Sequence, residues 1–160
     1  MAGYGSDTGF QDWLDENGHV LPEGALAPAI LRQRGSQYID GLYGSRFSGQ
    51  PAEGFAQERA WPRSGAYGHG QSIPTDVIPV AVERAAYAAA FQEALKPGSL
   101  SVSAMNAGAL KRKKIDVLEK EYFEGSGDAV ADNTLRLSAV EGLLEAVLLR
   151  TANSCVCCLR

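Results

Sequence analysis

The side chains that most often carry out catalysis are few in this sequence. The two histidines, His19 and His69, lie far apart along the chain, and neither is close to a motif of a serine or cysteine nucleophile. His69 stands in Gly68-His69-Gly70, which lacks the Lys-Ser/Thr pair that follows a phosphate-binding loop. We therefore expect no catalytic residues in this chain, and we expect that it is not an enzyme.

All three cysteines lie in the last six residues. An odd number at one end is not a disulfide framework, and a structural zinc site needs four ligands. We therefore expect no metal site and no cofactor. Residues 151–160 are interpreted as a flexible docking tail that folds back on the core or binds another chain, with the predicted contact residues Cys155, Val156, Cys157, Cys158, Leu159 and Arg160.

Basic and aromatic residues are the more informative groups. Lys111, Arg112, Lys113 and Lys114 form the one basic run, which is typical either of phosphate contacts or of a solvated loop. The Gly- and Pro-rich segment 44–72 holds a second group, namely Arg46, Arg59, Trp61 and Arg63. This group is typical of three structures: a platform that stacks single-stranded bases, a loop held in place by Trp61, or a subunit interface.

Within segment 44–72, individual roles can be predicted. We expect Trp61 first to anchor its loop in the core and only second to bind a partner. Arg46 and Arg63 are expected to pair with Asp40 or with a neighbouring subunit.

Four helices are predicted around these groups. Apolar spacing indicates helices over roughly 8–17, 27–42, 79–96 and 138–150. Thr8 with Gln11, and Ser138 with Glu141, fit capping boxes. Gly35, inside the second helix, costs about 1 kcal/mol relative to alanine, so we expect a close helix contact there.

The predicted fold class is mainly α: a small bundle of about four helices with a long irregular loop, an extended β arm or hairpin and a flexible C-terminal tail. Residues 1–150 are expected to form a single domain, with 99–125 as the extended arm. Its most regular part, 115–122, fits a strand or a helix, and we favour the strand.

Composition narrows the function further. The chain has 160 residues, 45% of them hydrophobic, and a formal net charge of −4, which suits one globular domain. No apolar run approaches the roughly 18 residues of a membrane span, so an integral membrane protein is excluded, and the N-terminus does not fit a secretory signal. The acidic balance argues against nonspecific coating of nucleic acid.

Two sequence blocks carry a resemblance to a known family. The block 38–49 (Tyr-Ile-Asp-Gly-Leu-Tyr-Gly-Ser-Arg-Phe-Ser-Gly) is followed by 57–66, which contains Ala-Trp-Pro-Arg. In this order the chain resembles small proteins of tailed phages and prophages, known as head–tail connector (adaptor, head-completion) proteins or as DnaT-like single-stranded-DNA-binding proteins. The resemblance covers roughly residues 8–95 and, more loosely, 111–123.

The connector resemblance implies a structural virion protein. Copies would form a homo-oligomeric ring, often twelvefold, beneath the portal protein, which would extend the DNA channel and provide the docking site for tail or neck proteins. DNA would pass through without sequence-specific contacts. The protein would be made in the host cytoplasm and reside at the virion neck. A mildly acidic ring suits a channel in which DNA must slide.

The other label implies a single-stranded-DNA-binding replication module. Its contacts would come from Arg59, Trp61, Arg63 and the run Lys111–Lys114. The net negative charge weighs against this alternative, and the sequence favours the connector.

Overall fold

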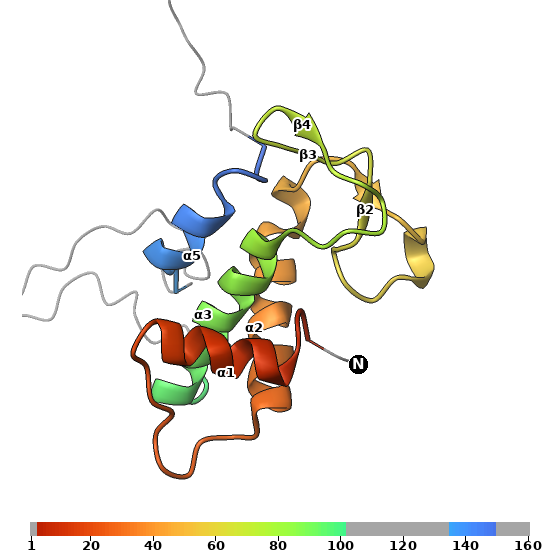
Figure 1. The fold of residues 1–160 in the computed structure, drawn as a ribbon. Helices are drawn as coiled ribbons and strands as arrows, with labels where there is room; N and C mark the ends of the chain where they lie inside the picture. The colour runs from red at the N-terminus through yellow and green to blue at the C-terminus, as the bar shows by residue number, and fades with distance from the viewer. Residues whose placement is uncertain (1–2, 102–134, 150–160) are drawn as a thin grey trace, which may run out of the picture.

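The computed structural model describes residues 3–101 and 135–149, and these form a mainly helical fold (Figure 1). Four α-helices lie within these ranges: α1 (Asp7–Glu16), α2 (Pro28–Tyr43), α3 (Val80–Leu95) and α5 (Ser138–Leu144). The two longest, α2 and α3, pack against each other, α1 crosses them and α5 packs on α3. The mainly α prediction is confirmed, and no helix of the described part is long and apolar enough to cross a membrane.

The helix ends differ in part from the capping predictions. The N-cap of α1 is Ser6, whose Oγ accepts a hydrogen bond from Gly9 N at 2.9 Å, so the predicted cap at Thr8 is wrong. Before α5 stands Leu137, which has no side-chain cap, and the predicted box at Ser138 is wrong as well.

The last helix is also shorter than the sequence indicates. After Leu144 the chain turns, and Leu148 pairs with Phe47 as an antiparallel bridge. Leu149 N then donates to Arg46 O at 2.8 Å. Backbone pairing with the 44–72 segment therefore ends the helix before the apolar periodicity ends.

Gly35 forms the close contact predicted for it. A Cβ on Gly35 would lie 2.3 Å from Ala86 O and 2.8 Å from Ala90 N, both on α3. The facing surface of α3 consists of alanines that are completely buried. Small residues on both helices therefore let the two backbones approach closely.

Two glycines of α2 provide a matched test of this contact. Gly35→Ala is expected to lower the free energy of unfolding by about 1–3 kcal/mol, since overpacking outweighs alanine's helix propensity. Gly41→Ala is expected to raise it by about 0.4–1 kcal/mol, because Gly41 is exposed and an added Cβ meets nothing within 4 Å. Urea denaturation of both variants measures the difference. Changes of the same sign would contradict the packing argument.

Segment 44–72 is more regular than the irregular loop that the sequence predicts. It contains the 3₁₀ turns η1 (Gly44–Arg46) and η2 (Gly54–Ala56) and four two-residue strands: β1 (Gln50–Pro51), β2 (Arg63–Ser64), β3 (Tyr67–Gly68) and β4 (Gln71–Ser72). Strand β1 pairs antiparallel with β2, and β3 with β4. These short pairs are held by side chains that reach into the core.

The core has two parts. The larger joins α2, α3 and α5 to the 44–72 segment and includes Tyr43, Phe47, Trp61, Val82 and Leu144. The smaller lies beneath α1 and includes Phe10, Leu14, Leu31, Tyr87 and Ala90. The predicted extended arm lies almost entirely outside the described residues, as does the tail 151–160.

Candidate functional site

Trp61 lies in the core and not on the surface. Only 1% of its surface is exposed, and its ring packs edge-to-face on Phe47 with centroids 5.5 Å apart. Its backbone N–H donates to the Tyr4 hydroxyl at 3.1 Å. The prediction that Trp61 anchors its loop is confirmed, and the indole is not placed to stack on a base in this conformation.

Arg63 is the second residue of this loop that lies inside. Its guanidinium, 6% exposed as a residue, donates to carbonyl oxygens of four residues. Nε reaches Ser48 O at 2.8 Å, Nη1 reaches Ala60 O at 3.1 Å, and Nη2 reaches Gly49 O at 2.7 Å and Phe47 O at 3.4 Å. Burial lowers the pKa of this guanidinium. Arg63 therefore clamps the loop backbone, and its expected pairing with Asp40 is wrong.

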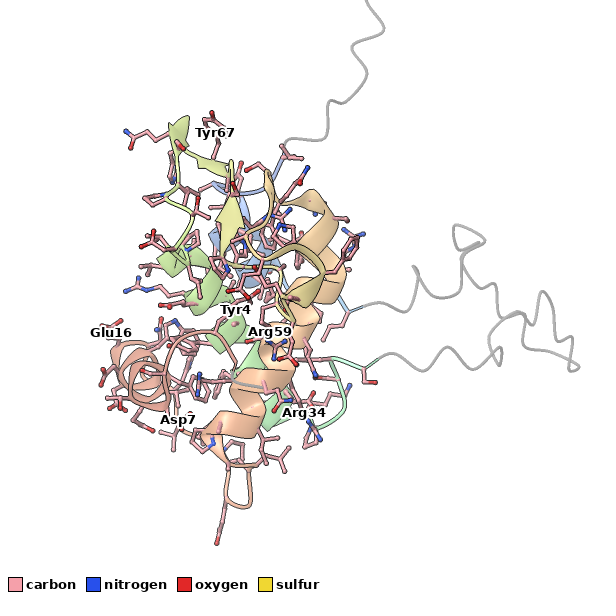
Figure 2. The ribbon with its side chains drawn as sticks, turned by 90° about the vertical axis from the view of Figure 1, so that its right-hand side faces the viewer. Tyr4, Asp7, Glu16, Arg34, Arg59 and Tyr67 are labelled. Atoms are coloured by element: carbon pink, nitrogen blue, oxygen red, sulfur yellow. The ribbon has the colours of Figure 1, made fainter. Side chains whose placement is uncertain are left out.

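Arg59 takes the place at Asp40 that was predicted for Arg46 or Arg63. Arg59 Nη1 lies 3.3 Å from Asp40 Oδ2, and its side chain is only 11% exposed. Tyr4 donates its hydroxyl proton to Asp40 Oδ1, and the Arg59 guanidinium lies 5.9 Å from the centre of the Tyr4 ring. Figure 2 shows Tyr4 and Arg59 next to each other in the middle of the molecule.

The carboxyl of Asp40 is strongly affected by its surroundings. Burial raises the pKa of Asp40, although the hydrogen bonds from Tyr4 and Arg59 act in the opposite direction. Burial and the nearby Asp40 charge raise the pKa of Tyr4 as well. The network ties α2 to the N-terminal segment and to the loop that carries Trp61.

Sequence reasoning missed a buried arginine on α2. Arg32, 7% exposed, pairs with Asp7 through Nε at 2.8 Å, and its Nη1 donates to the carbonyls of residues 3–5 at 2.8–3.1 Å. Ser36, one turn further on, accepts from Tyr4 N at 2.8 Å. Arg32, Ser36 and Asp40 follow a spacing of four, which puts them on one helix face. This polar stripe was the available signal for a segment packed on α2.

Arg46 keeps part of its surface exposed. Its guanidinium lies over the Tyr43 ring at 5.6 Å. It also lines a cleft of about 560 Å³ with Arg136, Glu141 and Glu145. Because two arginines face two glutamates there, this cleft has no strong preference for an anion.

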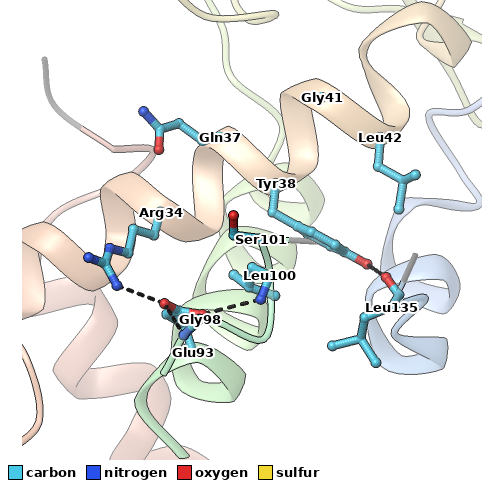
Figure 3. A pocket seen from close by; sticks show the side chains of 10 residues that line it. All are labelled: Arg34, Gln37, Tyr38, Gly41, Leu42, Glu93, Gly98, Leu100, Ser101 and Leu135. Atoms are coloured by element: carbon cyan, nitrogen blue, oxygen red, sulfur yellow. Dashed lines mark hydrogen bonds and ion pairs between the residues drawn. The ribbon is translucent and has the colours of Figure 1, made fainter. Parts of the chain in front are cut away.

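A larger groove of about 720 Å³ lies between α2 and the end of α3 (Figure 3). Arg34 pairs with Glu93 at 2.8 Å, and the backbone N–H groups of Gly98 and Leu100 also donate to Glu93. Burial alone raises the pKa of Glu93, but these donors outweigh it and hold the pKa below its ordinary value. The buried carboxylate is thus already satisfied by partners within the chain.

The two described residues that flank the interval 102–134 both lie at this groove. They are Ser101 and Leu135, and Tyr38 donates to Leu135 O at 2.7 Å. The basic run Lys111–Lys114 belongs to this interval and lies outside the described residues. So do the predicted contact residues of the tail, Cys155–Arg160. In the ranges 3–101 and 135–149, no three histidine, cysteine or acidic side chains are grouped as metal ligands would be.

These features define a small helical protein whose arginine- and tryptophan-containing loop is built into its core. The family model described as "Putative DnaT-like ssDNA binding protein" matches residues 3–160, and the chain belongs to this family. No match was found among curated proteins or among solved structures. The family match bears out the DnaT-like part of the resemblance and gives no support to the connector part.

Proposed function

We propose that this protein binds single-stranded DNA. The observation that carries the proposal is the match to the DnaT-like family over residues 3–160. The sequence favoured the connector, and the family match moves the preference to what was its alternative.

Of the DNA contacts that the sequence predicts, only the run Lys111–Lys114 is kept in this proposal. Arg59, Trp61 and Arg63 are engaged inside the protein, so the basic run Lys111–Lys114 is left as the main source of phosphate contacts. Tyr67, on β3, is 58% exposed and offers a ring for base stacking. Figure 2 shows Tyr67 at the end of the molecule farthest from α1.

Electrostatics sets the expected character of the binding. With a net charge of −4, attraction to DNA must come from a local basic group. Each cation that neutralises a phosphate of a single strand contributes roughly 0.7 to the slope of log affinity against log salt. Binding should therefore be weak at physiological salt and fall steeply as salt rises.

A titration of labelled oligo-dT, followed by fluorescence anisotropy at several salt concentrations, tests the proposal. Replacing Lys111–Lys114 by alanine is expected to weaken binding and to reduce the salt slope by up to about 3, from four contacts of roughly 0.7 each. Tyr67→Ala is expected to cost about 1–3 kcal/mol of binding free energy. Lys96→Ala, at an exposed lysine at the end of α3, is the control and should change neither affinity nor slope.

Absence of binding at low salt would contradict the proposal. That result would favour a second candidate, a ring of copies in a virion neck that binds a portal and a tail protein. The net acidity of the chain supports this candidate. Electron microscopy of the purified protein with and without a portal would then test it.

A further inference from the structure

Phe55 is the most exposed large apolar side chain of the described residues, with its whole surface open to solvent. It stands in η2, between β1 and β2. The turn is braced from within, because the Gln57 side chain donates to Arg59 O at 2.7 Å and to Pro62 O at 2.9 Å and accepts from Glu53 N at 3.1 Å. An ordered backbone thus presents an aromatic ring to solvent, although burying that ring would be worth about 1.5–3 kcal/mol.

A cleft of matching chemistry lies between α1, α3 and α5. Its volume is about 560 Å³, and its walls include Trp13, His19, Phe91 and Leu143. His19 stacks on Phe91 with ring centroids 4.3 Å apart, and Trp13 meets Phe91 edge-on at 6.4 Å. Such a cleft offers a phenylalanine ring both stacked and edge-to-face contacts.

The exposed ring and the cleft lie on opposite sides of the molecule. In Figure 1 the η2 turn lies at the right, while α1 and α5 lie at the left with α3 behind. A chain therefore cannot fill its own cleft with its own η2 turn. The ring and the cleft can meet only between two copies.

One cation of the cleft can pair with the acidic turn that carries Phe55, although Glu16 lines the cleft as well. Glu53 and Glu58, on either side of Phe55, are exposed. Arg84 lines the cleft with a side chain that is 51% exposed. Its ion pair with Glu16 is long, with 3.6 Å between Arg84 Nη2 and Glu16 Oε2. An incoming acidic turn can therefore pair with Arg84 as Phe55 enters.

We propose that the protein associates head to tail, with Phe55 of one copy seated in the α1–α3–α5 cleft of the next. Such a contact uses two different surfaces of each copy, so it repeats until the chain of copies closes or grows as a filament. Phe55 serves as the anchor of this interface, since aromatic residues in pockets supply most of the binding energy of protein contacts. The inference is independent of DNA binding.

Sedimentation velocity of the full chain, freed of nucleic acid and measured over a range of concentrations, tests this association. The wild type is expected to increase in mass with concentration, and Phe55→Ser is expected to remain a monomer. Tyr67→Ser is the control, since Tyr67 is also an exposed aromatic of segment 44–72, and it should associate like the wild type. A wild type that stays monomeric, or Phe55→Ser that associates unchanged, overturns the proposal.

A mixing experiment tests the head-to-tail geometry itself. Ala88→Trp fills the cleft but keeps Phe55, whereas Phe55→Ser keeps the cleft. Each variant alone should be a monomer, and an equal mixture should form a 1:1 dimer that grows no further. Arg84→Glu replaces Ala88→Trp if the tryptophan lowers the unfolding midpoint. A mixture that stays monomeric overturns the proposal, and because no DNA is present, the result is separate from the oligonucleotide titration.

Discussion

Replacing Trp61 with alanine is expected to lower the free energy of unfolding by about 3–5 kcal/mol, the usual cost of removing a buried large aromatic side chain. Trp61 is 1% exposed and packs on Phe47 in the larger part of the core. Removing the indole would leave a cavity where segment 44–72 joins the helices. Equilibrium denaturation in urea, followed by circular dichroism, measures the change.

Two further variants separate a role in the core from a role in binding. Trp61→Phe should cost much less than Trp61→Ala, because the buried indole N–H has no hydrogen-bond partner among residues 3–101 and 135–149, and only volume is lost. Val20→Ala, at an 83% exposed side chain in the loop after α1, should change stability by no more than about 0.5 kcal/mol. If Trp61→Ala kept its stability and lost only oligonucleotide affinity, the anchoring role would be wrong.

Replacing Arg63 with methionine is expected to be the second large effect, a loss of about 3 kcal/mol in the free energy of unfolding. Each buried acceptor left without its donor costs about 1–3 kcal/mol, and Arg63 donates to carbonyls of four residues. Water that enters the site would donate hydrogen bonds to some of these carbonyls. The expected loss in the free energy of unfolding is therefore close to that of two unsatisfied acceptors. Urea denaturation again measures the change.

Arg63→Lys distinguishes the clamp from a phosphate contact. A lysine keeps the charge but cannot direct donors at carbonyls on several sides, as the planar guanidinium does. We therefore expect Arg63→Lys to lose stability almost as Arg63→Met does. Arg136→Met, which removes an exposed arginine with a long ion pair, should change stability by no more than about 0.5 kcal/mol. Full stability of Arg63→Lys with retained oligonucleotide binding would contradict the internal role.

These two residues show why burial changes the functional interpretation. Arginine and tryptophan in a Gly- and Pro-rich segment are typical both of nucleic-acid contacts and of a loop fixed to a core. In this chain Trp61, Arg63 and Arg59 fix the loop to the core. A loss of oligonucleotide binding in their variants would therefore have to be separated from unfolding. The run Lys111–Lys114 and Tyr67 are the better residues with which to test DNA binding.

The sequence alone determined the elements that depend on local interactions. Proline at the first position of α2, the alanine-rich face of α3 and the apolar spacing of α1 each act over one or two turns, so the helices could be predicted within a few residues. Gly35 could also be predicted as a contact point, because glycine destabilises a helix interior and is favoured there where another backbone approaches closely.

Only the tertiary structure decided which polar side chains are internal and where several elements end. Helix α1 is capped by Ser6 and not by the predicted Thr8. The backbone N–H of Ser6 also donates a hydrogen bond to the distant Tyr87 hydroxyl, at 3.1 Å. The partners of Arg63 lie up to 16 residues away, and Trp61 N meets a hydroxyl 57 residues earlier. Such contacts leave no periodic pattern, because their energy depends on which distant backbone groups the fold brings to the same place.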